Sequence, residues 1–310
     1  MAQSTSAAEA ANYLHVRNDW LARRTEPILE PELPIIDPHH HLWDREGWRY
    51  LFDDLLADTN SGHNILATVF VQARAMLRAD GPEEMRPLGE VERVLEALAR
   101  AGGARYRGIR HIVAWDADPQ VCNPGNPAEP GMLADAKFRE GFAVLSRMGH
   151  SFDAWIYHPQ LDELANLADA FPDAKIVLNH CGGVVGINAY KKDEVFPVWK
   201  TSIDALAKRP NVYVKLGGLG MRLCGHAFDK LADPPSSQML ADAWRPYIET
   251  CITAFGAKRA MFESNFPVDK GSYGYPVFWN ACKILAKGAS AAEKADLFVG
   301  AAKRFYRLDI

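Results

Sequence analysis

Short β-rich runs alternate with helical patterns along most of this chain, and the alternation limits the folds available to it. The runs richest in β-branched and aromatic residues predict seven strands, at residues 34–37, 64–72, 106–113, 151–157, 175–179, 211–217 and 259–264. The stretches between them carry apolar residues at three- and four-residue spacing, which predicts helices at 91–101, 137–149, 160–171, 196–209, 243–257 and 289–308. Strands that alternate with helices form a mostly parallel sheet covered by helices, so the sequence predicts an α/β fold.

The chain has no internal repeat and no Pro- or Ser-rich linker that would divide it. Residues 1–33 are expected to form a lead-in, with a short helix between Asn12 and Arg24 followed by an extended arm. Residues 34–310 are expected to form a single barrel domain, because an α/β barrel commonly runs to about 250 residues.

Charge and composition narrow the range of partners. The 35 basic residues are outnumbered by 39 acidic ones, so the net charge of −4 gives no basic excess for nucleic acid. No stretch is apolar enough for a membrane span, and the amino-terminal residues lack the features of a secretory signal. Five widely spaced cysteines favour reduced thiols. We therefore expect a cytoplasmic protein with a small-molecule substrate and neither nucleic-acid nor membrane partners; a homo-oligomer is compatible with the sequence.

Two apolar strands end in histidines. The first is followed by His39, His40 and His41, and side-chain alternation places His39 and His41 on one face and His40 on the other. Two imidazoles on one face can begin a metal site or bind an oxyanion; a structural hydrogen-bond cluster is the alternative. His180 ends another strand, where a buried core histidine is again the alternative.

A third strand end carries Glu263, Asn265 and, in the following loop, Asp269. Glu263 and Asn265 would face the same side if the strand continued through both. A carboxylate in a barrel mouth can deprotonate water as a general base. The alternative is that Glu263 forms a structural ion pair with a nearby arginine.

These segments resemble the amidohydrolase superfamily, in particular the amidohydrolase-related group that includes sugar lactonases and pyrone-dicarboxylate lactonases. The motifs are HHHLWD, NHCG and MFESNFPVD, and the likeness runs from about Leu33 to the terminal helix. The resemblance implies a distorted TIM (β/α)8-type barrel that hydrolyses an ester or lactone, in a family with metal-dependent and metal-independent members. It also implies that His39, His41 and His180 are the family's strand-end histidines, able to bind a divalent metal such as Zn²⁺.

Two departures from the family pattern affect these expectations. At the end of the last strand the family commonly has Ser-Asp-Trp-Pro, and this chain has Ser264, Asn265, Phe266 and Pro267. A neutral amide therefore replaces the usual carboxylate, so an enzyme that works without a metal is also compatible with the sequence. Only the segment from Ala73 to Tyr106 separates the second and third predicted strands, which favours a barrel one strand-helix unit short of eight.

The sequence therefore predicts a hydrolase that opens a lactone or related cyclic ester of a small, anionic molecule. The histidines would polarise the carbonyl, directly or through Zn²⁺, while Glu263 or Asp269 activates water. Substrate contacts are expected from residues at strand ends, namely Gln72, Arg74, Arg110, Tyr157, His158 and Asn265. Arg110 is the expected anion clamp. A metal-dependent decarboxylase and a degenerate, non-catalytic barrel are the alternatives.

Overall fold

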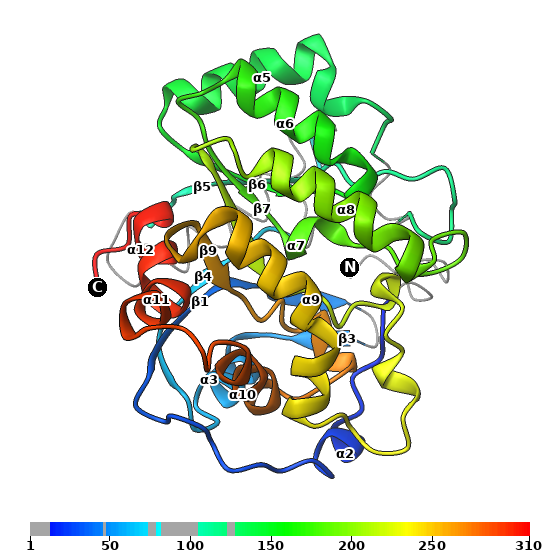
Figure 1. Cartoon of the computed structure of the whole chain (residues 1–310), viewed down its shortest axis with the longest axis vertical. Coiled ribbons are helices and arrows are strands. Elements are labelled where there is room, and N and C mark those ends of the chain that lie inside the picture. Colours follow the sequence, from blue (N-terminus) through cyan, green and yellow to red (C-terminus); the bar gives the residue numbers. More distant parts are fainter. Residues whose placement is uncertain (1–12, 46–47, 74–78, 82–104, 123–127) are drawn as a thin grey trace.

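Seven parallel strands line the centre of the molecule in the computed structural model, which describes residues 13–45, 48–73, 79–81, 105–122 and 128–310 (Figure 1). Five form one sheet in the order β5 (Gly108–Ile112), β6 (Ser151–Trp155), β7 (Lys175–Leu178), β8 (Val212–Leu216) and β9 (Ala260–Phe262). The other two, β1 (Pro34–His40) and β4 (Asn64–Phe70), pair with each other. All seven predicted strands are confirmed, and so is the predicted fold class, a distorted α/β barrel of TIM type.

The first and last of these strands adjoin, which joins the two sheets. His41 N–H donates to Phe266 O at 2.8 Å, and Asn265 N–H donates to His39 O at 3.0 Å. Among the described residues no ladder joins β4 to β5, although Arg110 on β5 donates to the carbonyl of Gln72 just beyond β4. The predicted helix at 91–101 and most of the short connection between residues 73 and 106 lie outside the described residues.

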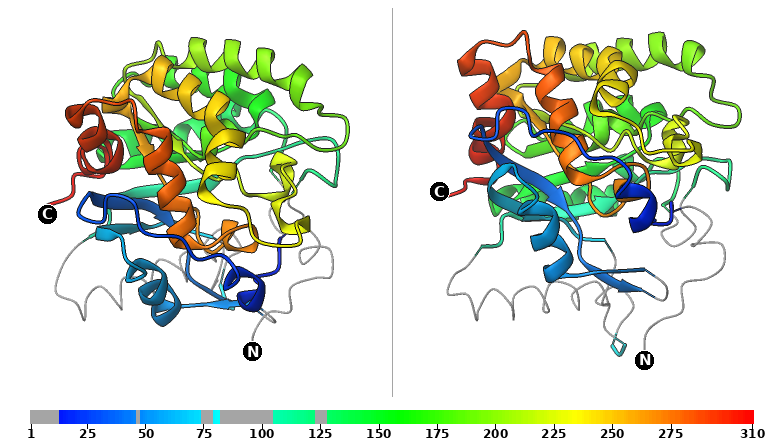
Figure 2. Two further views of the ribbon diagram at one scale, coloured as in Figure 1. Left: turned by 60° about the horizontal axis from the view of Figure 1, so that its bottom comes forward. Right: turned by 90° about the horizontal axis from the view of Figure 1, so that it is seen from below.

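Helices cover the outer face of the sheet, as Figure 2 shows. They are α5 (Ala136–Arg147), α6 (Leu161–Ala170), α8 (Lys192–Leu206) and α9 (Ser237–Phe255), each at a predicted position. Alternation along the strands is clear on β7, where Ile176 and Leu178 pack outward against the helices. Val177 packs inward with Ile36 and Met261.

The last helical segment packs against inward-facing residues of the strands. It consists of α11 (Ala291–Ala295), the π-helical turn η8 (Asp296–Gly300) and α12 (Ala301–Tyr306), within the predicted range. Phe305 and Tyr306 join the inward-facing cluster around Val177. Short 3-10 turns lie at η2 (Met132–Ala134), η3 (His158–Gln160), η4 (Arg222–Cys224), η5 (Phe228–Lys230), η6 (Ala257–Arg259) and η7 (Asp269–Gly271).

Five of the described elements, apart from the 3-10 turns, were not predicted; one is the four-residue helix α7 (His180–Gly183). Helix α10 (Tyr275–Leu285) is buried along nearly its whole length, including the polar side chains of Asn280 and Lys283. The antiparallel strands β2 (Trp43–Arg45) and β3 (Trp48–Tyr50) and helix α3 (Phe52–Thr59) are short and follow the histidine motif.

The lead-in packs along the barrel. Among its described residues, 13–33, the short helix α2 (Asn18–Leu21) lies within the segment where a short helix was expected. Trp20 on α2 donates its indole N–H to Ala232 O at 3.1 Å. None of the described helices is long and apolar enough to cross a membrane.

Candidate active site

The three strand-end histidines lie together, as expected. His39 and His41, at the end of β1, bring their Nε2 atoms within 3.1 Å of each other. His180 begins the short helix α7 (His180–Gly183) after β7, and its ring centroid lies 4.6 Å from that of His39. His40 points away from them and stacks edge-on against Phe70, as alternation predicts.

Glu263 occupies the space between two of these histidines. Its Oε1 lies 2.6 Å from His180 Nδ1 and accepts from the His180 backbone N–H at 3.1 Å. Its Oε2 lies 2.7 Å from His39 Nδ1. The predicted alternative, a structural ion pair with an arginine, is therefore wrong, because the carboxylate meets imidazoles. Gly217 permits this packing, since a Cβ there would lie 2.6 Å from Glu263 Cγ.

A buried lysine adjoins the cluster, and sequence reasoning missed it. Lys215 Nζ lies 2.6 Å from Asp153 Oδ1 and donates to Pro38 O at 2.9 Å. The same ammonium lies 3.0 Å from His39 Nδ1. The signal was available: in VYVKLG the lysine is the only charged residue, at a position where alternation turns it inward with Tyr213.

Burial and nearby positive charge keep His39 and His41 neutral. Desolvation lowers the pKa of both imidazoles well below the usual value, and the charges of Lys215 on His39 and Arg110 on His41 act in the same direction. His41 Nδ1–H donates to Val71 O at 2.8 Å, so His41 Nε2 is an acceptor. Lys215 donates to His39 Nδ1, which leaves His39 Nε2–H as the donor toward His41.

Asn265 and Asp269 form a separate pair beside the histidines. Strand β9 ends at Phe262 and Asn265 adopts a positive φ of 55°, so the condition for Glu263 and Asn265 to share a strand face is not met. The Asn265 amide donates to Asp269 Oδ1 at 3.0 Å. Asp269 also accepts from Tyr273 Oη at 2.5 Å and Gly220 N at 3.1 Å, and burial raises its pKa to about 7.

Of the remaining predicted contact residues that the structure describes, Tyr157 and His158 follow β6, whereas Arg110 lies in the middle of β5 and not at its end. Tyr157 Oη donates to Val121 O at 2.8 Å, and His158 Nδ1 accepts from Val185 N–H at 3.2 Å. Burial lowers the pKa of His158 to about 4, so this ring is neutral. Arg110 is buried and lies near the histidines, and Arg74 lies outside the described residues.

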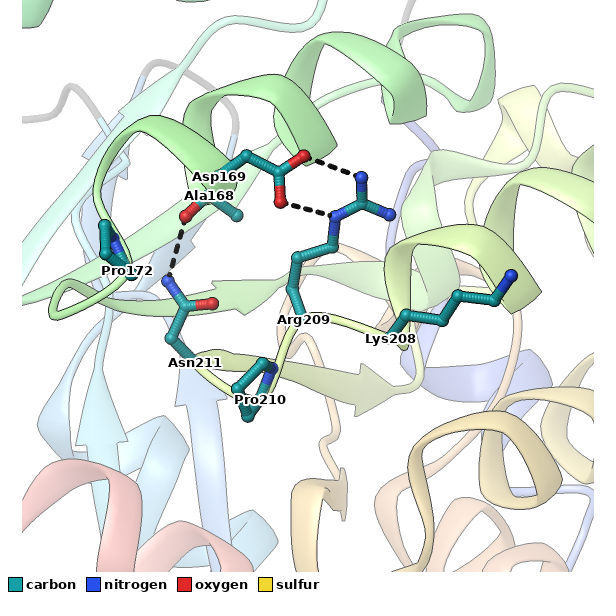
Figure 3. Close-up of a pocket in the computed structure, with 7 residues that line it drawn as sticks. All are labelled: Ala168, Asp169, Pro172, Lys208, Arg209, Pro210 and Asn211. Carbon is teal, nitrogen blue, oxygen red and sulfur yellow. Dashed lines mark hydrogen bonds and ion pairs between the residues drawn. The ribbon is translucent and has the colours of Figure 1, made fainter.

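A surface pocket lies at the opposite ends of the strands (Figure 3). Its lining residues precede β7 and β8, namely Ala168, Asp169, Pro172, Lys208, Arg209, Pro210 and Asn211. Arg209 Nη2 and Nε lie 2.7 and 3.0 Å from the two oxygens of Asp169, so this pair bridges α6 and the end of α8. In TIM-type barrels that face supports stability, whereas the histidines lie at the carboxyl ends.

Comparison with known proteins identifies the family. The model of the amidohydrolase family matches residues 36–308. The chain belongs to the amidohydrolase family. It is 31% identical to an uncharacterized Sinorhizobium fredii protein, covering 89% of this chain and 99% of that one. It is 26% identical to an L-fucono-1,5-lactonase of Burkholderia multivorans, covering 88% and 96%.

Solved structures agree on the fold of this amidohydrolase. An amidohydrolase from Burkholderia multivorans with bound zinc has a TM-score of 0.67 at 22% identity, covering 89% of this chain and 99% of that one. A putative 2-pyrone-4,6-dicarboxylic acid hydrolase from Pseudomonas putida has a TM-score of 0.60 at 17% identity, covering 90% and 99%.

The donor set at the centre of the site fits a divalent cation. His39, His180 and Glu263 each offer a ligand atom, and these atoms lie within 4.8 Å of one another. Glu263 Oε2 is buried and has no hydrogen bond of good geometry among the described residues. Imidazole nitrogen and carboxylate oxygen are ligands that Zn²⁺ accepts. This set shares two histidines with the predicted one and has Glu263 in place of His41.

Proposed function

We propose that this amidohydrolase opens a lactone or related cyclic ester of a small, anionic molecule by attack of water on the carbonyl. The observation that carries the proposal is the buried Glu263 carboxylate held between His39 and His180. It supplies the carboxylate that Asn265 cannot. A base beside the neutral His39 and His41 suits the transfer of a proton from water while a carbonyl gains negative charge.

The chain's own residues account for each proton in this reaction. His39 Nε2–H is the donor that we assign to the carbonyl oxygen, with His41 and His180 beside it. The water oxygen bonds to the carbonyl carbon, and the water proton passes to Glu263. The ring C–O bond then breaks and the departing alkoxide takes that proton, which leaves a hydroxy acid.

A divalent ion is compatible with this scheme. His39, His180 and Glu263 would hold it, and a bound Zn²⁺ would supply Lewis-acid polarisation of the carbonyl. The ammonium of Lys215, 4.0 Å from Glu263 Oε2, opposes a further positive charge nearby. We assign binding of the substrate's anionic group to Arg110. Asp269, the alternative candidate for the general base, is less suited to that role because it already accepts three hydrogen bonds.

Relatives support the substrate class. Besides the lactonase above, an L-fucono-1,5-lactonase of Burkholderia ambifaria is 27% identical over 69% of this chain and 65% of that one. A 5-carboxyvanillate decarboxylase from Novosphingobium aromaticivorans has a TM-score of 0.52 at 15% identity, a likeness in fold alone. A cytoplasmic location and a small-molecule substrate without nucleic-acid or membrane partners remain predictions from the sequence.

Proton release on incubation with a set of lactones tests the proposal. The set should include L-fucono-1,5-lactone, sugar γ-lactones and 2-pyrone-4,6-dicarboxylate. We expect hydrolysis of at least one, faster for lactones that carry a carboxylate. Carbon dioxide release from aromatic carboxylic acids without any lactone hydrolysis would favour the decarboxylase, and inactivity toward both sets would favour the degenerate barrel.

A further inference from the structure

Asn179, just after β7, has a buried side chain that forms no hydrogen bond within the described part of the chain. Its backbone is satisfied, because its N–H donates to Ala154 O at 3.0 Å and its carbonyl accepts from Gly182 N–H at 2.9 Å. The residue is 0% exposed, yet among the described residues neither Oδ1 nor Nδ2 has a hydrogen-bond partner. Buried amides are almost always hydrogen-bonded, so this one calls for an explanation.

The strand geometry turns this amide into the barrel. Asn179 keeps extended dihedral angles and has the parity of Val177, which packs inward with Ile36 and Met261. Leu178 is in register with Ala154 on one side and Val214 on the other. Continuing the register by one residue places Asn179 between Trp155 and Lys215.

The backbone that follows Asn179 contacts the proposed base. Glu263 Oε1 accepts from the backbone N–H of His180, so the carboxylate lies beside the peptide that joins Asn179 to His180. Glu263 Oε2, which lies 2.7 Å from His39 Nδ1, is a third buried atom without a hydrogen bond among the described residues. The described part of this region therefore holds one donor, Asn179 Nδ2, and two acceptors, Asn179 Oδ1 and Glu263 Oε2, that form no hydrogen bond.

We propose that Asn179 and Glu263 together hold the hydrolytic water, with Asn179 as its positioning residue. The inference rests on the proposed function. Water would donate to Glu263 Oε2 and accept from Asn179 Nδ2, which leaves its other lone pair free for the carbonyl carbon. As the new C–O bond forms, the donated proton passes to Glu263 and later to the alkoxide. A fixed orientation of this water lowers the entropic barrier to attack.

A matched pair of substitutions tests this role. Asn280 is similarly buried, but its Oδ1 accepts from Leu29 N–H and its Nδ2 donates to Pro27 O, both at 2.9 Å. Asn280→Ala should lower the melting temperature with little effect on turnover by the folded protein. Asn179→Ala should lower the melting temperature less, because no protein hydrogen bond is lost, and should reduce kcat on the order of 100-fold with little change in KM.

Two results would overturn the proposal in an enzyme that hydrolyses lactones. One is a loss of melting temperature in Asn179→Ala as large as that in Asn280→Ala, because the amide would then be bonded within the protein. The other is wild-type turnover by Asn179→Ala.

A crystal structure of the ligand-free wild-type protein separates this inference from the proposed function. We expect an ordered water within about 3.2 Å of both the Asn179 amide and Glu263 Oε2. If no lactone is hydrolysed, the proposed function fails, yet this water would still support the water site. Absence of water from that position, or a side-chain partner for the amide, would overturn the site whether or not lactones are hydrolysed.

Discussion

Glu263 is the residue whose role a single substitution tests most directly. Glu263→Gln keeps the shape of the side chain and removes its charge and basicity. If Glu263 accepts the proton of water, kcat should fall on the order of 100-fold, with a smaller change in KM. Steady-state kinetics on the best lactone measures this, with Glu249→Gln on the surface of α9 as the control.

The opposite result has a defined meaning. A lower melting temperature combined with normal turnover by the remaining folded protein would make Glu263 a structural partner of His39 and His180. The base would then have to be Asp269, whose pKa burial raises to about 7, or a histidine.

Lys215 provides a second test at the residue scale, of stability. Lys215→Met leaves the buried Asp153 carboxylate without its cation and should reduce the free energy of unfolding by about 3–5 kcal/mol. Urea denaturation measures the change. Lys200→Met removes a half-exposed partner of Asp204 and should cost at most about 1 kcal/mol.

A further variant separates charge from packing. Adding Asp153→Asn to Lys215→Met removes the unpaired charge and keeps an acceptor for Tyr306 Oη, so part of the stability should return. If Lys215→Met alone is as stable as the wild type, the buried ion pair contributes no net stability.

Prediction of the site from sequence succeeded where a local signal marked a residue. His39 and His41 end one apolar strand, His180 ends a second and Glu263 ends a third, so strand order alone indicated one common edge. Lys215 and Asn179 could not be picked out in this way, because they lie within or beside apolar segments whose pattern predicts only a buried strand. The contact of Glu263 with two imidazoles depends on tertiary packing that no local pattern encodes.

At the scale of elements, the amphipathic helices and the strands were predictable because each has one buried face with a regular period. Helix α10 was not predicted, and it is covered along nearly its whole length, by α9 and the extended arm among others. The arm itself has no periodicity, and its position is set by contacts with residues far along the chain.

Lys283 on α10 should hold this arm in place. Its Nζ donates to Leu29 O at 2.7 Å and Glu30 O at 2.9 Å and lies 2.8 Å from His63 Nδ1. Lys283→Met should therefore loosen the arm and speed tryptic cleavage after Arg23 and Arg24, followed by mass spectrometry. Lys287→Met is the control, because Lys287 is exposed and lies just beyond the end of α10. Equal rates of cleavage in the two variants would contradict the role of Lys283 in holding the arm.

At the scale of the whole molecule, the candidate site contains residues from the first and the last strands of the barrel. His39 lies near the end of β1 and Glu263 follows β9, and these strands adjoin through His41 and Phe266. His180 comes from β7, two strands away from β9 in the sheet. A ligand shared by the three residues would therefore cross-link parts of the chain that separate when the barrel unfolds.

Zinc should for this reason stabilise the whole protein. A cation that binds the folded chain alone adds about 2.7 kcal/mol at a concentration 100 times its Kd, enough to raise the melting temperature by several degrees. Calorimetry after treatment with EDTA, with and without added Zn²⁺, measures this. The rise should disappear in His180→Ala, because one of the three ligands is removed. The opposite result is an unchanged melting temperature together with less than one metal ion per chain in the active protein. It would mean that the histidines and Glu263 act without a metal, as the replacement of the family's usual aspartate by Asn265 allows.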